Sequence, residues 1–227
     1  MSIIANLQSK QLMQEEITTD KKTIIIETAE KLFATNGYDA TSIRDIAKAG
    51  SFNSSMISYY FGSKEKLMEG ILIYRTTSLE NVFGPLLSSG KSPLEKLYIM
   101  NNFYIEKIFQ HKYFYLLIFQ IQSLSDKYKL IKTFYDETRY KNFKILDKII
   151  KDGQALKYFR EDIDTSFLLF VLSGTMNNVM VNKDYYREVN QIGDMPEEDF
   201  NNLLKERAKN FLTERIEEIV LFRPPSV

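Results

Sequence analysis

The spacing of hydrophobic residues near the end of the chain restricts the possible fold more than any other feature. Between Phe200 and Val220 these residues recur three or four positions apart, with Lys and Glu side chains between them. This is the pattern of an amphipathic helix that buries one face. A similar stripe runs from Ile131 to Ile149, and we find no convincing alternation of the kind typical of strands. We therefore predict an all-α protein.

Local start and stop signals divide this helical pattern into segments. Gly37 predicts a helix end, because a residue without a Cβ tolerates the left-handed conformation that often follows the last turn. Ser92 followed by Pro93 is typical of a helix start, and Gly153 predicts the end of another helix. Such signals predict about nine helices, over residues 20–36, 43–49, 54–60, 64–87, 93–110, 113–123, 127–152, 165–186 and 197–221.

The composition excludes several classes of protein. The 227 residues include no Cys and one His, His111, which excludes Cys nucleophiles, thiolate sites and multi-His metal sites. No catalytic pair of carboxylates is recognisable, so we expect no enzyme activity, no cofactor and no metal. The longest apolar stretch, residues 167–181, is too short and too polar to span a bilayer. We expect a cytoplasmic protein that does not bind membranes.

Residues 41–61 have the layout of a helix-turn-helix motif, in which a tight turn joins two short helices. Ser42 and Asp45 have the spacing of a capping box at the start of the first helix. Asn53 is a good N-cap for the second helix. Short hydroxyl side chains on that helix allow close approach to a DNA groove.

A dense run of matches to a known pattern lies in and around this motif. It consists of an Ala-x-x-Leu-Phe helix end, then Gly-Tyr, a Thr-Ser pair, an Ile-Ala pair, a short turn and an aromatic-Phe-x-x-Lys-Glu-x-Leu run. The matching residues are Ala29, Leu32, Phe33, Gly37, Tyr38, Thr41, Ser42, Ile46, Ala47, Tyr60, Phe61, Lys64, Glu65 and Leu67. The run resembles the DNA-binding domain of the TetR family of transcriptional repressors, whereas the rest of the chain resembles that family only in layout.

The resemblance implies which residues bind double-stranded DNA. The helix at residues 54–60 would lie in the major groove. Arg44 matches a position that often contacts DNA, and Tyr60 and Lys64 match positions that bond the phosphate backbone. Lys64 would also begin a helix, whose exposed N–H groups favour an anion. The expected DNA-binding residues are Thr41, Ser42, Arg44, Asn53, Ser54, Ser55, Ser58, Tyr59, Tyr60 and Lys64.

Two residues depart from the family pattern. Gly is usual where Ser51 stands, with Gly50 one position earlier, and Ser58 stands where Tyr is frequent. The formal net charge is zero, and residues 41–66 carry only four basic residues against two acidic ones. These features leave open an alternative function, a small-molecule-binding module that has kept the fold and lost specific DNA binding.

The resemblance also divides the chain into an N-terminal extension (residues 1–18), a DNA-binding domain (19–66) and a ligand-binding and dimerisation domain (67–227). Thirteen aromatic residues lie between Tyr98 and Phe143. They would suit an ordinary core, or a pocket for a small apolar or aromatic effector. The candidate ligand contacts are Phe103, Tyr104, Phe119, Phe134, Tyr135 and Asn177.

The segment from Thr165 to Tyr186 is apolar on more than one side, which predicts a helix buried against several neighbours. With the last helix of the chain it would form the four-helix interface of a homodimer, where the TetR family also dimerises. The candidate interface residues are Phe167, Phe170, Gly174, Leu204, Phe211 and Ile219. The resulting hypothesis is a repressor that a small molecule releases from a palindromic operator. The identities of effector and operator, and the choice between repression and activation, stay open.

Overall fold

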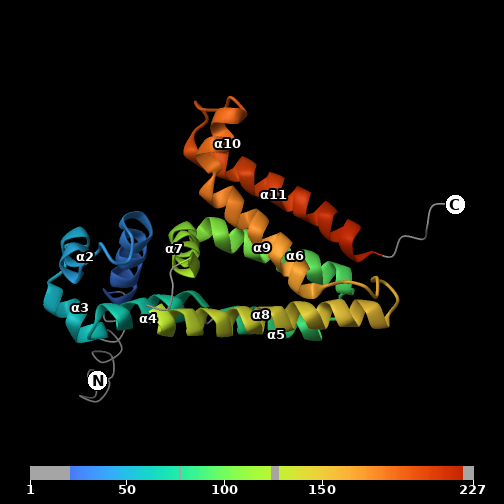
Figure 1. Ribbon diagram of the computed structural model, residues 1–227, viewed down its shortest axis with the longest axis horizontal. Helices are drawn as coiled ribbons and strands as arrows, with labels where there is room; N and C mark the ends of the chain where they lie inside the picture. Colours follow the sequence, from blue (N-terminus) through green and yellow to red (C-terminus); the bar gives the residue numbers. More distant parts are fainter. Residues whose placement is uncertain (1–20, 77, 124–127, 222–227) are drawn as a thin grey trace, which may run out of the picture.

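The computed structural model describes residues 21–76, 78–123 and 128–221. In these residues the regular structure is helical, with residues 21–36 in a first helix and ten further helices, α2 to α11 (Figure 1). The all-α prediction is confirmed. The extension predicted for residues 1–18 lies outside the described residues.

Three short helices form the N-terminal part: residues 21–36, α2 (Ile43–Ala49) and α3 (Ser54–Phe61). Their apolar faces share one core, whose most deeply buried members include Ile25 and Phe33. This agrees with the helix-turn-helix layout predicted from the caps.

Both predicted N-caps are present. The Ser42 hydroxyl accepts a hydrogen bond from the backbone N–H of Asp45, and the Asp45 carboxylate accepts one from the backbone N–H of Ser42 at 2.8 Å. The Asn53 side chain accepts the backbone N–H of Ser55 at 2.9 Å. Each cap satisfies N–H groups that a helix N-terminus would otherwise leave unpaired.

The turn between α2 and α3 depends on two neighbouring small residues. A Cβ at Gly50 would lie 1.9 Å from the ring of Phe52, so a larger residue there would have to displace this ring. Ser51 has a φ of 56°, in the left-handed region that favours glycine. The residue that needs conformational freedom is therefore Ser51, which stands where the TetR pattern usually has glycine.

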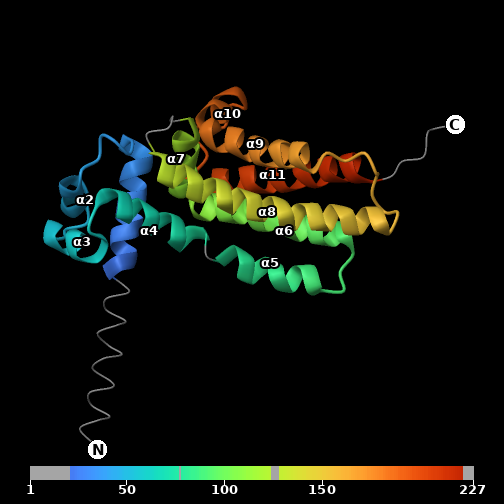
Figure 2. The same cartoon turned by 60° about the horizontal axis from the view of Figure 1, so that its bottom comes forward.

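One long helix was expected over residues 64–87, and this prediction is wrong. The segment forms α4 (Lys64–Thr76) and α5 (Ser78–Ser88), which run in different lines (Figure 2). The Thr76 hydroxyl donates to the carbonyl of Leu72 at 2.7 Å, a local bond that bends helices. The fully buried ring of Phe83 holds α5 against a second core, which lies in the C-terminal part and includes Leu97, Leu146 and Ile149.

The C-terminal part is a bundle in which α6 (Pro93–Gln110), α8 (Lys129–Ala155), α9 (Thr165–Val181) and α11 (Glu197–Val220) pack side by side (Figures 1 and 2). α7 (Lys112–Ser123) lies between the bundle and the N-terminal helices, and α10 (Lys183–Val189) follows α9 after Asn182. The single helix expected over 165–186 is therefore two helices.

Gly153 does not end α8, contrary to the sequence prediction. The helix continues to Ala155, and a Cβ at Gly153 would lie 2.1 Å from the buried ring of Phe159. Gly153 thus gives Phe159 room to pack, and the positive φ lies at Lys157, with a value of 58°.

Candidate DNA-binding surface and ligand cavity

The N-terminal end of the molecule presents one face of α2 and α3 to solvent (Figure 1). Arg44 on α2 is exposed, and Tyr59 on α3 is 83% exposed. Exposed residues of α3 also include Ser54, Ser55 and Ser58. Because Ile57 points into the core, this face of α3 is free to approach another molecule.

Three of the predicted DNA contacts have structural roles in this part of the chain. Thr41 is only 1% exposed, and its hydroxyl donates to the carbonyl of Gly37 at 2.9 Å. Its side chain fixes the turn before α2 and is not available to a phosphate, which corrects the prediction. The side chains of Ser42 and Asn53 are exposed, but each is engaged as a helix cap.

Tyr60 and Lys64 lie together at the junction of α3 and α4. Tyr60 is half-buried, and its ring packs edge-on against Tyr59 with the ring centroids 5.2 Å apart. The Lys64 ammonium lies 4.3 Å from the ring centroid of Tyr38 and donates to the carbonyl of Asp39 at 3.4 Å. The positive charge of Lys64 is therefore held at the junction of α3 and α4 by contacts with the turn before α2.

A cavity of about 410 Å³ lies between α4, α6, α7, α8 and α9. Of the predicted ligand contacts, Tyr104, Phe119, Tyr135 and Asn177 line it. Two do not. Phe103 packs against Phe83 with the ring centroids 5.2 Å apart, and Phe134 packs against the core of the N-terminal part.

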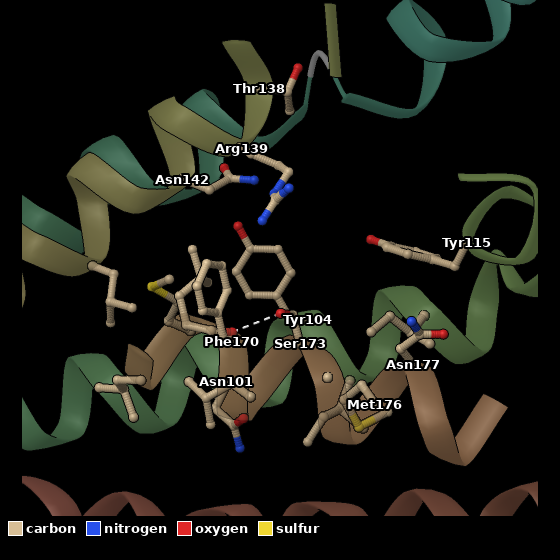
Figure 3. Close-up of a pocket in the computed structure, with 18 of the residues that line it drawn as sticks. Asn101, Tyr104, Tyr115, Thr138, Arg139, Asn142, Phe170, Ser173, Met176 and Asn177 are labelled. Carbon is tan, nitrogen blue, oxygen red and sulfur yellow. Dashed lines mark hydrogen bonds between the residues drawn. The ribbon is translucent and has the colours of Figure 1, made fainter. Parts of the chain in front are cut away.

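Polar groups are gathered on one side of this cavity. Arg139 and Asn142 project from α8 toward the hydroxyl of Tyr104, and Tyr115 points into the same space from α7 (Figure 3). Burial raises the pKa of the Tyr104 and Tyr115 hydroxyls well above the usual range. Both phenols are therefore protonated at neutral pH and can donate hydrogen bonds.

An ion pair connects the cavity wall to the N-terminal helices. Arg75 of α4 lines the cavity, and its guanidinium donates to both carboxylate oxygens of Glu30, at 2.6 and 3.2 Å. Glu30 belongs to the first helix, is 4% exposed, and also accepts the backbone N–H of Phe114 in α7. Burial raises the pKa of Glu30, and the bonds from Arg75 oppose this rise. Three elements thus meet at one carboxylate.

Four of the six predicted interface residues are exposed, and we refer to these four as the exposed strip. They are Phe167, Phe170 and Gly174 of α9 and Phe211 of α11. Phe170 and Gly174 also line the cavity. Ile219 is half-buried against the second core. Leu204 is 3% exposed and faces the interior of the bundle, so its side chain is not on the strip.

Residues 25–71 match the family of bacterial regulatory proteins described as tetR. The HTH-type transcriptional repressor KstR2 of Mycolicibacterium smegmatis is 30% identical over 148 residues, which make up 63% of this chain and 70% of that protein. The chain belongs to the TetR family. A transcription regulator with a DNA-binding helix-turn-helix domain is therefore confirmed.

Solved structures of TetR regulators share the fold across both parts of the chain. KstR2 of Mycobacterium tuberculosis matches with a TM-score of 0.66 and 19% identity, covering 89% of this chain and 96% of that one. FadR from Bacillus subtilis in complex with stearoyl-CoA matches with a TM-score of 0.62 and 17% identity, covering 84% and 97%. At these identities the likeness shows the fold alone.

The sequence did not point to most of the residues that line the cavity, among them the polar residues Arg75, Tyr115, Arg139 and Asn142. A signal for two of them was present. Tyr135, Arg139, Asn142 and Leu146 follow one another at spacings of three and four, which places Arg139 on the inward stripe of α8. A charged residue on a core-facing stripe is a functional candidate, because an unpaired buried charge is costly.

Neither a metal-binding cluster nor a membrane-spanning helix is present in the described residues. In residues 21–76, 78–123 and 128–221, no group of His, Asp or Glu side chains is arranged to hold a metal ion. No helix in the same residues has the length and apolar character that crossing a membrane requires.

Proposed function

We propose that this protein is a ligand-responsive repressor. As a homodimer it places the α3 helices of its two subunits in successive major grooves of a palindromic operator, ~34–36 Å apart. A small, largely apolar effector binds in the cavity and lowers the affinity for DNA.

The observation that carries this proposal is the course of α4. This helix begins at Lys64 beside the DNA-binding surface and ends at Thr76 in the cavity wall. Its Arg75 grips Glu30 of the first helix, so that a displacement of the end of α4 acts on the N-terminal domain through a buried ion pair. One rigid element therefore touches both sites.

Release follows from linkage between the two sites. An effector lowers DNA affinity only if it binds the shape that does not fit DNA more tightly than the shape that does. Arg75 and Thr76 lie in the cavity wall, so an occupant of the cavity contacts the end of α4 directly. We infer that the effector shifts α4 and, with it, the distance between the two α3 helices of a dimer.

The exposed strip supports the dimer. Phe167, Phe170 and Phe211 are each more than half exposed, which is unusual for residues of this size. A matching strip on a second copy would cover them in a two-fold interface. Because the basic excess around α3 is small, operator affinity would depend strongly on having two domains on one site.

Selection of binding sequences from random DNA, followed by fluorescence anisotropy on the enriched site, tests the proposal. Tyr59→Ala and Arg44→Ala should each weaken binding about tenfold or more while leaving the dimer intact. Tyr158→Ala is the control, because Tyr158 is also an exposed tyrosine but lies beyond α8. No enrichment of any sequence at low salt would contradict the proposal.

The alternative is a TetR-like binding module without specific DNA recognition. Ser58 in place of Tyr and the strained Ser51 turn favour it. Enrichment of a palindromic sequence excludes this alternative, whereas ligand binding without any enrichment supports it.

A further inference from the structure

Arg139 is a charged side chain in a largely apolar cavity. Its guanidinium projects from α8 beside Asn142 and toward the hydroxyl of Tyr104 (Figure 3). Arg160 and Arg187 each form an ion pair with a carboxylate. In the parts of the chain that the structure describes, Arg139 has no such partner, and its nearest aromatic neighbour is Tyr135, 5.7 Å from guanidinium carbon to ring centroid.

The charge of the cavity wall has one sign. Among the described residues that line it, two are cationic, Arg75 and Arg139, and none is Asp or Glu. Glu30 neutralises Arg75 from outside the cavity. The half-buried guanidinium of Arg139 has no carboxylate partner among the described residues, so it is available to an anionic group of an occupant.

Two hydroxyl donors face the same side. The Tyr104 hydroxyl is buried and has no hydrogen-bond partner among the described residues. Tyr115 points toward it from α7 (Figure 3). Leaving a buried donor unpaired is unfavourable, and an acceptor oxygen on a ligand would remove that cost.

The wall formed by α6, α9 and α11 is mostly apolar and carries no charged side chain among the described residues. It contains aliphatic and thioether side chains, among them Leu97, Met100, Leu168, Leu172, Met176 and Ile216, and the neutral polar side chains of Asn101, Ser173 and Asn177. Such a wall binds a hydrocarbon body and offers no countercharge to a second charged group.

We propose that the cavity binds a small amphipathic carboxylate. The carboxylate is held by the fork of Arg139 and by the hydroxyls of Tyr104 and Tyr115, and the apolar body lies against α6 and α9. The inference rests on the proposed function, because it names the chemical class of the effector for the same cavity. It also predicts that cations are rejected.

Three probes with the same tail and different heads test the inference by isothermal titration calorimetry: decanoate, decan-1-ol and decyltrimethylammonium. Decanoate should bind the wild-type protein most tightly and the cation least. Absence of decanoate binding, or an equal affinity for the alcohol, overturns the inference without any variant.

Arg139→Met keeps an unbranched, apolar stem and removes the charged guanidinium. It should weaken decanoate binding by about tenfold to a hundredfold and leave decan-1-ol unchanged. Arg139→Lys should recover part of the loss. Arg160→Met is the control, because Arg160 is an exposed arginine outside the cavity. Equal losses for both probes in Arg139→Met would contradict a specific role for the charge.

Operator release, measured by anisotropy with the same probes, separates this inference from the proposed function. Release by decan-1-ol with no advantage for decanoate would overturn the inference and support the proposed function. Decanoate binding that depends on Arg139 but does not release DNA would support the inference and contradict the proposed function.

Discussion

The N-terminal helices use small residues mainly to turn the chain, with Gly50 as the exception that makes room for a ring, whereas in the bundle Gly153 serves packing alone. In the N-terminal part, Gly37 and Gly62 have φ values of 89° and 78°, and Ser51 has 56°, so these residues set the direction of the chain. In the bundle, Gly153 has an ordinary helical backbone and makes room for the ring of Phe159. The first part is determined mainly by local turn geometry, and the second by packing between helices distant in sequence.

Both parts contain buried polar groups, and they differ in whether open space lies beside an unpaired one. In the N-terminal part, Thr41 and Glu30 are buried with hydrogen-bond partners, and the Tyr38 hydroxyl, which has none among the described residues, lies in a packed core. In the bundle, the Tyr104 hydroxyl also lacks a partner among the described residues, but it lies beside a cavity. A satisfied polar group stabilises one structure, whereas an unsatisfied one beside open space suits a site that a ligand completes.

The largest expected effect comes from breaking the ion pair that joins the two parts. Arg75→Met should lower the free energy of unfolding by about 3 kcal/mol, because it leaves the carboxylate of Glu30 buried without its partner. Glu69→Gln, which removes the exposed pair with Lys66, should cost less than about 1 kcal/mol. Urea unfolding measures both, and equal losses would show that the connection is no stronger than a surface pair.

The pH dependence of the stability of Arg75→Met shows whether the unpaired carboxylate of Glu30 causes the loss. Burial already raises the pKa of Glu30, and without Arg75 that pKa rises further. A carboxyl with a raised pKa in the folded state binds protons more readily there than in the unfolded chain, so stability falls as the pH rises through that pKa. The deficit relative to wild type should therefore shrink on acidification, and a deficit independent of pH would point to lost packing instead.

Gly153→Ala tests how strongly the stability of the bundle depends on close packing between its side chains. The new Cβ would lie 2.1 Å from the ring of Phe159, which is itself buried, so the variant should lose about 2 kcal/mol through overpacking. Thermal unfolding followed by circular dichroism compares the variant with the wild-type protein. An unchanged midpoint would show that the ring of Phe159 can move aside at little cost.

The difference between local turn geometry and long-range packing explains which features could be predicted from the sequence. Ser42, Asn53 and Ser92 are local signals, and the helices that they begin were predicted to within a residue or two. The ends of α8 and α10 are followed by Lys157 and Gln191 at positive φ, and these residue types do not indicate a turn. The ligand contacts Phe103 and Phe134 were wrong because composition alone does not tell which aromatic rings fill a core and which line a cavity.

The smallest expected effect comes from Ser51, the non-glycine residue with a left-handed backbone in the turn between α2 and α3. Ser51→Gly should raise the free energy of unfolding by about 1 kcal/mol, because glycine adopts the left-handed conformation without the steric cost that a Cβ carries. Ser54→Gly is the matched control, because Ser54 is the first residue of α3. This variant should give no gain in stability. Both variants leave Phe52 and the cap at Asn53 unchanged. The difference that urea unfolding measures is therefore the contribution of the backbone conformation to the free energy of unfolding. A loss of stability in Ser51→Gly would mean that the serine side chain itself stabilises the turn, and the N-terminal part would then depend on side-chain contacts as the bundle does.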